Sequence, residues 1–515
     1  MIEKYKILIL ISIATLIRCV IAATIGLGND EVYYVTYAQH LQWNYFDHPP
    51  MVALLIRLST FNLLFTNAFF IRLGPILLAA INTYLIYDIC SKIKNENAGF
   101  LAALLFSCSF YSSIIAGVFI LPDAPQLFFW IFSISLLIKI VSAIESDKNF
   151  NYNILLFGVV AGLCIMSKVH GVFLWIGFGL YILFYKRSLL SNGYLYLSVL
   201  ISLVIISPIL IWNIENHFIT YTFHSNRVTL NRVTLNRGMN PNSFFREFLG
   251  GIFYNNPINY FLIITALIAV WKNKINISLP VKRLLLLLSL PLIVLLLFIS
   301  LFRDTLPHWS GPAFVALIIL TACYLADSVQ DLNVNFKLPK LVVISCVFII
   351  IISFTGIVLI NYYPGTIGNN KEELLGKGDV TLDMYDWDFF KNEFEKIHYK
   401  DVQSRKTKTT FIINNKWFPG AHIDNYIAQP LHLDFIAMGK LEDIHTYEWL
   451  NKYRKKIKIG DDAYFITVST NYMDPKEQYN MFFEKINPPV IIKQFRNKKP
   501  VRNMLVYLLE GYKGE

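Results

Sequence analysis

The sequence predicts a polytopic α-helical membrane protein with a small α/β domain at its C-terminal end. Of its 515 residues, 55% are hydrophobic and 16% are charged, a balance typical of membrane proteins rather than soluble ones. Apolar runs of about 20 residues recur along the chain, and each is long enough to cross a hydrocarbon core of about 30 Å as a helix. After residue 361 the apolar runs shorten and charged residues become frequent.

About eleven apolar runs are expected to span the membrane, because a helix pairs its backbone polar groups within the segment. The first run follows a basic start, so a signal peptide cleaved near Ala22 is the alternative, but the run is longer than the apolar core of such a peptide. The predicted spans lie near residues 6–27, 68–90, 98–120, 124–144, 152–167, 169–185, 194–212, 254–271, 284–302, 311–326 and 341–361.

The distribution of Lys and Arg predicts the orientation, since both residues collect in cytoplasmic loops. The opposite loops and, with an odd number of spans, the C-terminal tail should face outward. We therefore expect a membrane domain of residues 1–361 and an outward domain of residues 362–515. The loops expected to be cytoplasmic contain Lys4, Lys6, Lys92, Lys94, Lys148, Lys186, Arg187, Lys272, Lys274, Lys282, Arg283, Lys337 and Lys340.

The tail alternates between strand-like and helix-like stretches, which predicts an α/β domain. Runs of β-branched and aromatic residues at 410–413, 463–468 and 490–492 indicate strands. Helical patterns lie between them, at 387–396 and 444–455.

Charge and cysteine content exclude several classes of partner. The formal net charge of +11 does not indicate nucleic acid, because the cytoplasmic loops use much of this charge for topology. All six cysteines lie in or at the ends of predicted spans. Neither a disulfide framework nor a zinc–cysteine site is therefore expected.

The first outward loop, residues 28–67, carries two dense polar motifs. Residues 30–34 read Asp-Glu-Val-Tyr-Tyr, and residues 45–51 read Tyr-Phe-Asp-His-Pro-Pro-Met. Carboxylates at a membrane boundary are costly to desolvate, so their density there indicates a use. This loop is the first candidate for an active site, although its aromatic residues also suit an interfacial belt.

Further polar patches lie at the outward ends of later spans, at residues 122–125, 168–170 and 303–309. A carboxylate at such a boundary can act as a general base, because partial desolvation raises its pKa. Neighbouring cations can neutralise a phosphate leaving group. These are the parts needed for transfer from a phosphate-linked lipid donor to a hydroxyl or phosphate acceptor. Taken alone, Asp123 could instead cap the helix that follows it.

A tandem repeat at residues 227–238 spaces Arg227, Arg232 and Arg237 evenly. Surface loops accept insertions at low cost, so a slipped duplication explains the repeat as well as a guanidinium cluster that binds phosphate. We expect Arg227 to be functional and the second copy to be dispensable, because Arg227 follows the polar run at 224–226.

These motifs resemble those of the dolichyl-phosphate-mannose-protein mannosyltransferase superfamily. The likeness is closer to its bacterial branch of glycosyltransferase family 39-like and aminoarabinose-transferase-like proteins. It rests on residues 30–34, 45–51, 121–125 and 307–309, and it extends weakly to residues 443–447. The resemblance implies a GT-C fold in a bacterial inner membrane, with two amphipathic helices in the first outward loop and the tail in the periplasm. It also implies a polyprenyl-phosphate sugar as donor.

By this resemblance Asp30 and Asp123 match the family's loop carboxylates and are the expected catalytic residues. Asp47 and His48 stand where aminoarabinose transferases carry a Glu-Lys pair, which leaves both the acceptor and the sugar open. The expected acceptor is lipid A or another envelope glycolipid, and a divalent cation is compatible with the pattern although none is required. The residues expected to bind substrate are Glu31, Tyr33, Asp47, His48, Lys168, His170, Arg227, Arg303 and His308.

Two other functions fit parts of the pattern. In protein O-glycosylation the outward domain would bind a polypeptide acceptor. A lipid or solute transporter would use the polar loops as a vestibule. Transporters place polar residues near the bilayer midplane, whereas the ionisable residues here gather at one boundary, which favours chemistry at the surface.

Overall fold

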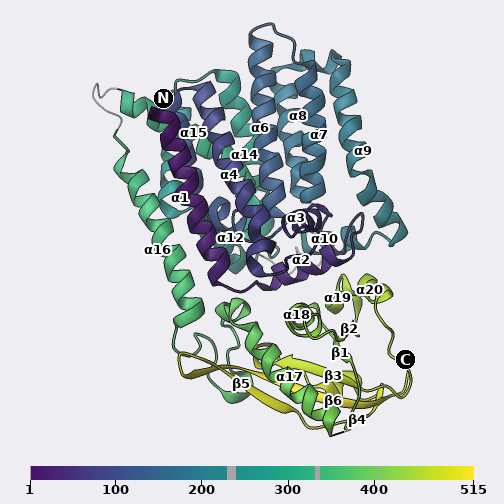
Figure 1. The fold of residues 1–515 in the computed structure, drawn as a ribbon. Helices are drawn as coiled ribbons and strands as arrows, with labels where there is room; N and C mark the ends of the chain where they lie inside the picture. Colours follow the sequence, from purple (N-terminus) through teal and green to yellow (C-terminus); the bar gives the residue numbers. More distant parts are fainter. Residues whose placement is uncertain (1, 229–238, 331–336, 405, 515) are drawn as a thin grey trace. The chain divides into compact units, whose positions relative to one another are not determined.

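The computed structural model describes residues 2–228, 239–330, 337–404 and 406–514 (Figure 1). The chain divides into two compact units. The membrane unit comprises Met1–Ile21 and Gln42–Ser353, and the sheet unit comprises Ala22–Leu41 and Phe354–Glu515. This division differs from the expected boundary after residue 361, because residues 22–41 associate with the C-terminal part of the chain.

The membrane unit is helical, and each predicted span overlaps one of its helices. Residues 28–67 form two further helices, of which the first belongs to the sheet unit. The helices are α1 (Ile2–Thr24), α2 (Asn29–Gln39), α3 (Met51–Ser59), α4 (Ala68–Ile93), α5 (Glu96–Cys108), α6 (Asp123–Glu145), α7 (Asn151–Ser167), α8 (Val172–Tyr185), α9 (Gly193–Glu215), α10 (Ile219–Val228), α12 (Pro241–Tyr254), α13 (Pro257–Trp271), α14 (Leu279–Ser300), α15 (Gly311–Gln330) and α16 (Lys340–Tyr362).

Within the described residues, seven helices are long and apolar enough to cross a membrane, and the pair α12 and α13, bent by 96°, makes an eighth if it is one span. The helices α5 and α7 and the segment Val169–Tyr185 are apolar but shorter. The polytopic helical fold is thereby confirmed, while the number of about eleven spans stays a prediction. The seven long helices are α1, α4, α6, α9, α14, α15 and α16.

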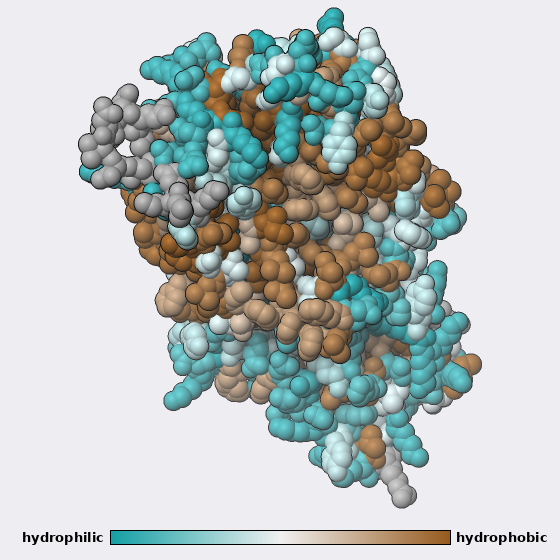
Figure 2. All heavy atoms as spheres, turned by 45° about the horizontal axis from the view of Figure 1, so that its top comes forward, coloured by the Kyte–Doolittle hydropathy of each residue, from teal (hydrophilic) through white to brown (hydrophobic). Residues whose placement is uncertain are grey.

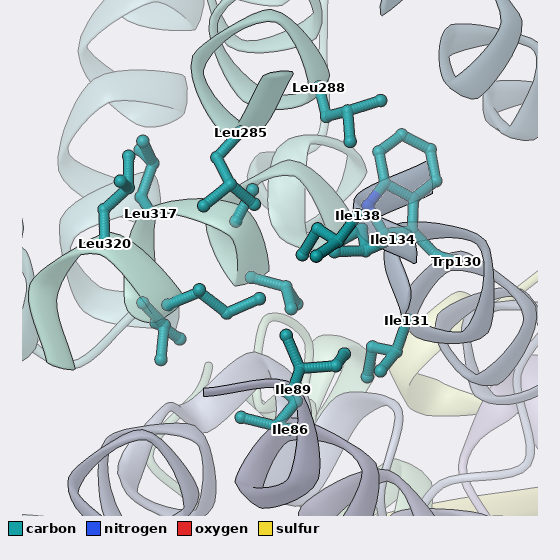
Figure 3. Packing of buried hydrophobic residues seen from close by; sticks show 14 of the residues in the cluster. Ile86, Ile89, Trp130, Ile131, Ile134, Ile138, Leu285, Leu288, Leu317 and Leu320 are labelled. Atoms are coloured by element: carbon teal, nitrogen blue, oxygen red, sulfur yellow. The ribbon is translucent and has the colours of Figure 1, made fainter. Parts of the chain in front are cut away.

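The core of the membrane unit lies between α4, α6, α14 and α15. Ile89, Trp130, Ile134, Leu285 and Leu317 are buried members of this core (Figure 3). By contrast, large hydrophobic side chains are exposed on the outer faces of α1, α9 and α16. Figure 2 shows hydrophobic side chains spread over the surface of the membrane helices. Such a surface suits contact with lipid.

Close helix packing in this unit depends on small residues, as is usual in membranes. A Cβ atom at Gly158 of α7 would lie 2.4 Å from the carbonyl oxygen of Ser198 in α9. The hydroxyl groups of Ser198 and Ser202 donate to the carbonyl oxygens of Ile154 and Gly158, at 2.6 and 2.5 Å. Glycine at this crossing therefore lets the two backbones touch.

The sheet unit contains a mixed six-stranded sheet of order β2-β1-β3-β6-β4, with β5 also paired to β6. β1 runs parallel to β2 and β3, whereas β6 is antiparallel to β3, β4 and β5. The predicted α/β domain is confirmed, although β2, β4 and β6 were not predicted. The strands are β1 (Phe411–Asn414), β2 (Asp434–Ala437), β3 (Ala463–Val468), β4 (Phe483–Ile486), β5 (Val490–Arg496) and β6 (Lys499–Tyr512).

The helices of the sheet unit are short apart from α17, which covers the predicted helix at 387–396. The predicted helix over 444–455 is wrong as a single element, because the chain there forms one short helix and a 3-10 turn at Asn451–Tyr453. His445 has a positive φ of 52°, which interrupts the helical path just before that helix. The helices are α17 (Trp387–Gln403), α18 (Trp417–Ile423), α19 (Leu441–Ile444), α20 (Tyr447–Leu450) and α21 (Pro475–Tyr479).

Candidate active site

A buried ion pair joins Asp123 and Lys168 in the membrane unit. The Lys168 Nζ atom donates to both carboxylate oxygens of Asp123, at 3.0 and 2.8 Å. The hydroxyl of Tyr111 also donates to Oδ1 of Asp123, at 3.1 Å. Asp123 and Lys168 are 2% and 3% exposed. Because a buried charge is costly without a partner, each of these two residues requires the other.

The antiparallel packing of α6 and α7 brings the two charges together. Asp123 is the first residue of α6, and Lys168 directly follows the last residue of α7, so both lie at the same end of the helical pair. Gly171 lets the chain turn back tightly, since a Cβ atom there would lie 2.7 Å from the backbone at Cys164. The N-cap position of α6 is occupied by Pro122 rather than by Asp123. The capping interpretation of Asp123 therefore does not describe this structure.

Three histidine side chains lie within electrostatic range of the pair. Lys168 and Asp123 both act electrostatically on His48, His170 and His308. The ring centroids of His170 and Trp309 are 5.7 Å apart. The structure thus collects the polar patches at 47–48, 168–170 and 307–309 around one carboxylate.

His48 is also close to a histidine that sequence reasoning did not select. The ring centroids of His48 and His224 are 5.9 Å apart, and His224 Nε2 donates to the carbonyl oxygen of Asp47 at 2.6 Å. Burial lowers the pKa of His48 to about 3, against the opposing effect of Asp47. His48 is therefore neutral at physiological pH, so its ring carries no charge there, and its role in substrate binding stays a prediction.

Tyr111 is a second residue that the sequence did not reveal. It begins the π-helix Tyr111–Ile115, a rare element that is frequent at functional sites. Its ring packs against the start of α15, since a Cβ atom at Gly311 would lie 2.4 Å from the ring. Tyr111 lies inside an apolar run that predicts a membrane span, so no local signal separates it from the core.

The structure describes the two predicted arginines, Arg303 and Arg227, to different extents. Arg303 lies in the turn after α14, where its carbonyl oxygen accepts a hydrogen bond from Ser243 at 2.7 Å. The backbone of Arg227 belongs to α10, and residues 229–238 of the repeat lie outside the described residues. The roles of both arginines stay predictions.

Asp30, Glu31 and Tyr33 lie on α2 in the sheet unit. Asp30 is exposed in the first turn, where a negative charge is favoured by the helix dipole. Glu31 is buried, and its Oε2 atom accepts a hydrogen bond from the backbone N–H of Gly28 at 2.8 Å. This is the reciprocal contact of a capping box, so Glu31 has a structural contact that fixes the start of α2.

The two predicted catalytic carboxylates therefore differ in what they can do. Asp123 already accepts three hydrogen bonds from Lys168 and Tyr111, so both of its carboxylate oxygens are occupied. Asp30, by contrast, is exposed. Across the described part of the chain, no group of three or more His, Cys, Asp and Glu side chains is placed to hold a metal ion.

Known proteins share this fold. Residues 47–212 match the family described as dolichyl-phosphate-mannose-protein mannosyltransferase. The apo structure of ArnT from Cupriavidus metallidurans is similar over 98% of both chains, with a TM-score of 0.62 and 13% identity. The structure of the same protein bound to undecaprenyl phosphate is similar over 97% of both chains, with a TM-score of 0.57 and 14% identity. No curated protein sequence matches the chain.

The structural likeness shows the fold, and the family match covers the helices that position Asp123 and Lys168. It also covers the second polar motif of the first outward loop, with Asp47 and His48. The chain therefore has the GT-C fold of ArnT, and its residues 47–212 are similar to the dolichyl-phosphate-mannose-protein mannosyltransferase family.

Proposed function

We propose that this protein transfers a sugar from a polyprenyl-phosphate-linked donor to lipid A or another envelope glycolipid on the periplasmic face of a bacterial inner membrane. The observation that carries the proposal is the buried pair of Asp123 and Lys168 with histidines around it. The binding of undecaprenyl phosphate by ArnT, which has the same fold, supports this class of donor.

Lys168 is suited to hold the phosphate of the donor. Its ammonium group has three N–H donors, and Asp123 accepts from it at two positions. Among the described residues, this leaves the third N–H of Lys168 available to a phosphate oxygen. Asp123 orients the ammonium group and compensates its charge in a buried place. His170 and His308 add donors that can stabilise the phosphate as it leaves.

Asp30 is suited to act as the general base. In the proposed reaction an acceptor oxygen attacks the anomeric carbon of the sugar while the bond from that carbon to the phosphate oxygen breaks. The configuration at the carbon inverts, the polyprenyl phosphate leaves, and Asp30 takes the proton of the acceptor hydroxyl. An acceptor phosphate would carry no such proton and would need Asp30 only for positioning.

The test is transfer by the purified protein from polyprenyl-phosphate sugars that carry a hexose, a hexosamine or a pentosamine. Mass spectrometry of lipid A and of proteins identifies both the sugar and the acceptor. Product on protein alone would support O-glycosylation and exclude the glycolipid acceptor. Failure of the wild-type protein to use any of these donors would overturn the proposed function.

The Asp30→Asn variant tests the base. Turnover should fall by roughly 10²-fold or more, because the amide keeps the size of the carboxylate but cannot take the proton. Donor affinity should change far less. Glu372→Gln is the matched control, since Glu372 is an exposed carboxylate of the same unit, paired with Lys493. Near-normal turnover in Asp30→Asn would remove the base role from Asp30.

A further inference from the structure

The helix that carries Asp30, α2, is too short to be stable without tertiary contacts. α2 has 11 residues, and isolated helices shorter than about 12–15 residues are marginal in water. Its residues 31–38 are all buried. The position of Asp30 is therefore set by whatever α2 packs against, and within the sheet unit that partner is the C-terminal part of the chain, including α18 (Figure 1).

The entry to α2 is held through its backbone. The N–H of Gly26 donates to the carbonyl oxygen of Met384 at 2.9 Å, and a Cβ atom at Gly26 would lie 2.6 Å from that oxygen. The N–H of Leu27 donates to the hydroxyl of Tyr426 at 3.0 Å. Only glycine fits at position 26 without a shift of one of these two segments of chain.

A buried histidine joins the same two segments. His422 Nε2 lies 3.3 Å from the carbonyl oxygen of Leu27 and 3.0 Å from that of Asp383. Burial lowers the pKa of His422 to about 3, so the ring is neutral at physiological pH. Because both neighbours are acceptors, the proton resides on Nε2 and is shared between them.

A side-chain hydrogen bond fixes the residue next to Asp30. The amide nitrogen of Asn29 donates to Oδ2 of Asp383 at 2.9 Å. Burial raises the pKa of Asp383 to about 6, with Arg502 opposing the rise. Asp383 is therefore mostly ionised at pH 7, and hydrogen bonds to ionised acceptors are about twice as strong as neutral ones.

The second turn of α2 also contacts the C-terminal segment. The backbone N–H of Thr446 donates to the hydroxyl of Tyr33 at 3.3 Å, and the ring of Tyr33 lies 5.0 Å from that of Trp417. Contacts with the C-terminal segment thus run from the entry of the helix into its second turn.

We propose that Asn29, Asp383 and His422 are positioning residues that hold Asp30 in the geometry needed for transfer. The sheet unit is then part of the catalytic machinery and does more than bind an acceptor. The inference rests on the proposed role of Asp30 as base. It assigns a function to three residues outside the family match at 47–212.

A reciprocal exchange tests the contact between Asn29 and Asp383. Asn29→Asp places two carboxylates against each other and should lower kcat about 10-fold or more, with the donor KM little changed, because small misplacements of a reacting group are costly. The double variant with Asp383→Asn restores a donor and an acceptor in reversed order, and kcat should recover to within about 3-fold of wild type. Since both variants carry the added carboxylate at position 29, recovery separates the contact from the added charge.

Hydrogen exchange in the full-length protein gives a readout that does not depend on activity. Amides of residues 26–39 should exchange faster in Asn29→Asp than in wild type and return to the wild-type rate in the double variant. Lys493→Ala, which removes an exposed ion pair of the same unit, should leave them unchanged. Tyr426→Phe, which deletes one hydroxyl, should show the same direction of change if Asn29→Asp fails to fold.

Two results would overturn the inference. One is a loss of kcat in Asn29→Asp with unchanged exchange at residues 26–39, which would assign the effect to charge beside Asp30. The other is no recovery in the double variant. If the wild-type protein transfers no sugar, the proposed function fails, but the exchange rates still decide whether Asp383 holds α2.

Discussion

At the scale of single residues, the free energy of unfolding should depend strongly on the pairing of Asp123 with Lys168. Lys168→Met should destabilise the protein by about 3–5 kcal/mol, because it leaves the Asp123 carboxylate buried without its cation. The double variant with Asp123→Asn should recover most of this loss. Chemical unfolding in detergent micelles measures the free energies.

An exposed ion pair on α4 serves as the control for that experiment. Lys92 and Asp88 are 2.6 Å apart, with exposed fractions of 64% and 30%. Lys92→Met should cost less than about 1 kcal/mol, since surface pairs contribute little. Equal losses in Lys92→Met and Lys168→Met would contradict the burial described for Asp123.

Residue types and their spacing selected part of the candidate site. Asp123, Lys168, His170 and His308 were selected because charged and polar residues stand out at the ends of apolar runs, and their roles stay predictions. Tyr111 could not be found in this way, since a tyrosine within an apolar run has the pattern of a core residue. Its role depends on a hydrogen bond to a residue of the next helix, which leaves no local signal.

At the scale of elements, the π-helix Tyr111–Ile115 packs closely against the start of α15, where Gly311 contacts the ring of Tyr111. Gly311→Ala should destabilise the protein by about 1–3 kcal/mol, the usual cost of overpacking, because the new Cβ atom meets the ring of Tyr111 at 2.4 Å. Turnover should fall with it, since Tyr111 holds Asp123. Thermal unfolding and transfer assays measure the two effects.

Gly179 provides the matched control, because it is also a glycine in a helix of the membrane unit and a Cβ atom there has no heavy atom within 4 Å. Gly179→Ala should be neutral or stabilising, as is usual for such a change in a helix interior. A loss of stability in Gly179→Ala equal to that in Gly311→Ala would show that the Tyr111 contact is not the cause.

Apolar periodicity predicted the helices well, but it could not predict the bend between α12 and α13. Asn256 at this bend has a positive φ of 66°, and its side chain donates to the carbonyl oxygens of Cys108 and Ser345. Those partners lie far away in sequence. β6 was missed for a related reason: Arg502 interrupts its apolar pattern, yet it is buried with its guanidinium 4.4 Å from the ring of Trp387.

At the scale of the whole molecule, the distribution of Lys and Arg predicts which side each loop faces. A reporter that is active only outside the cytoplasm should give signal when it is fused after Gly365, beyond α16. The same reporter fused at Lys148, between α6 and α7, should be silent. The reverse pattern would invert the orientation and place the proposed site on the cytoplasmic side.

The association of residues 22–41 with the C-terminal segment could not be predicted from the sequence. Hydropathy places these residues between two membrane helices, and it carries no information about partners hundreds of residues away. The contact between Asn29 and Asp383 joins positions 354 apart. Only the folded structure reveals that the two segments form one compact unit.

The long stretch of sequence between α2 and its partners affects the order in which the protein assembles during synthesis. The ribosome makes α2 early and its partners at 383, 422 and 426 much later, and contacts so distant in sequence form slowly because a long loop must close first. The segment with Asp30 therefore lacks these partners until the distal part of the chain has emerged and folded. On the proposed role of Asp30, a nascent chain holds no assembled site and does not consume the lipid-linked sugar donor.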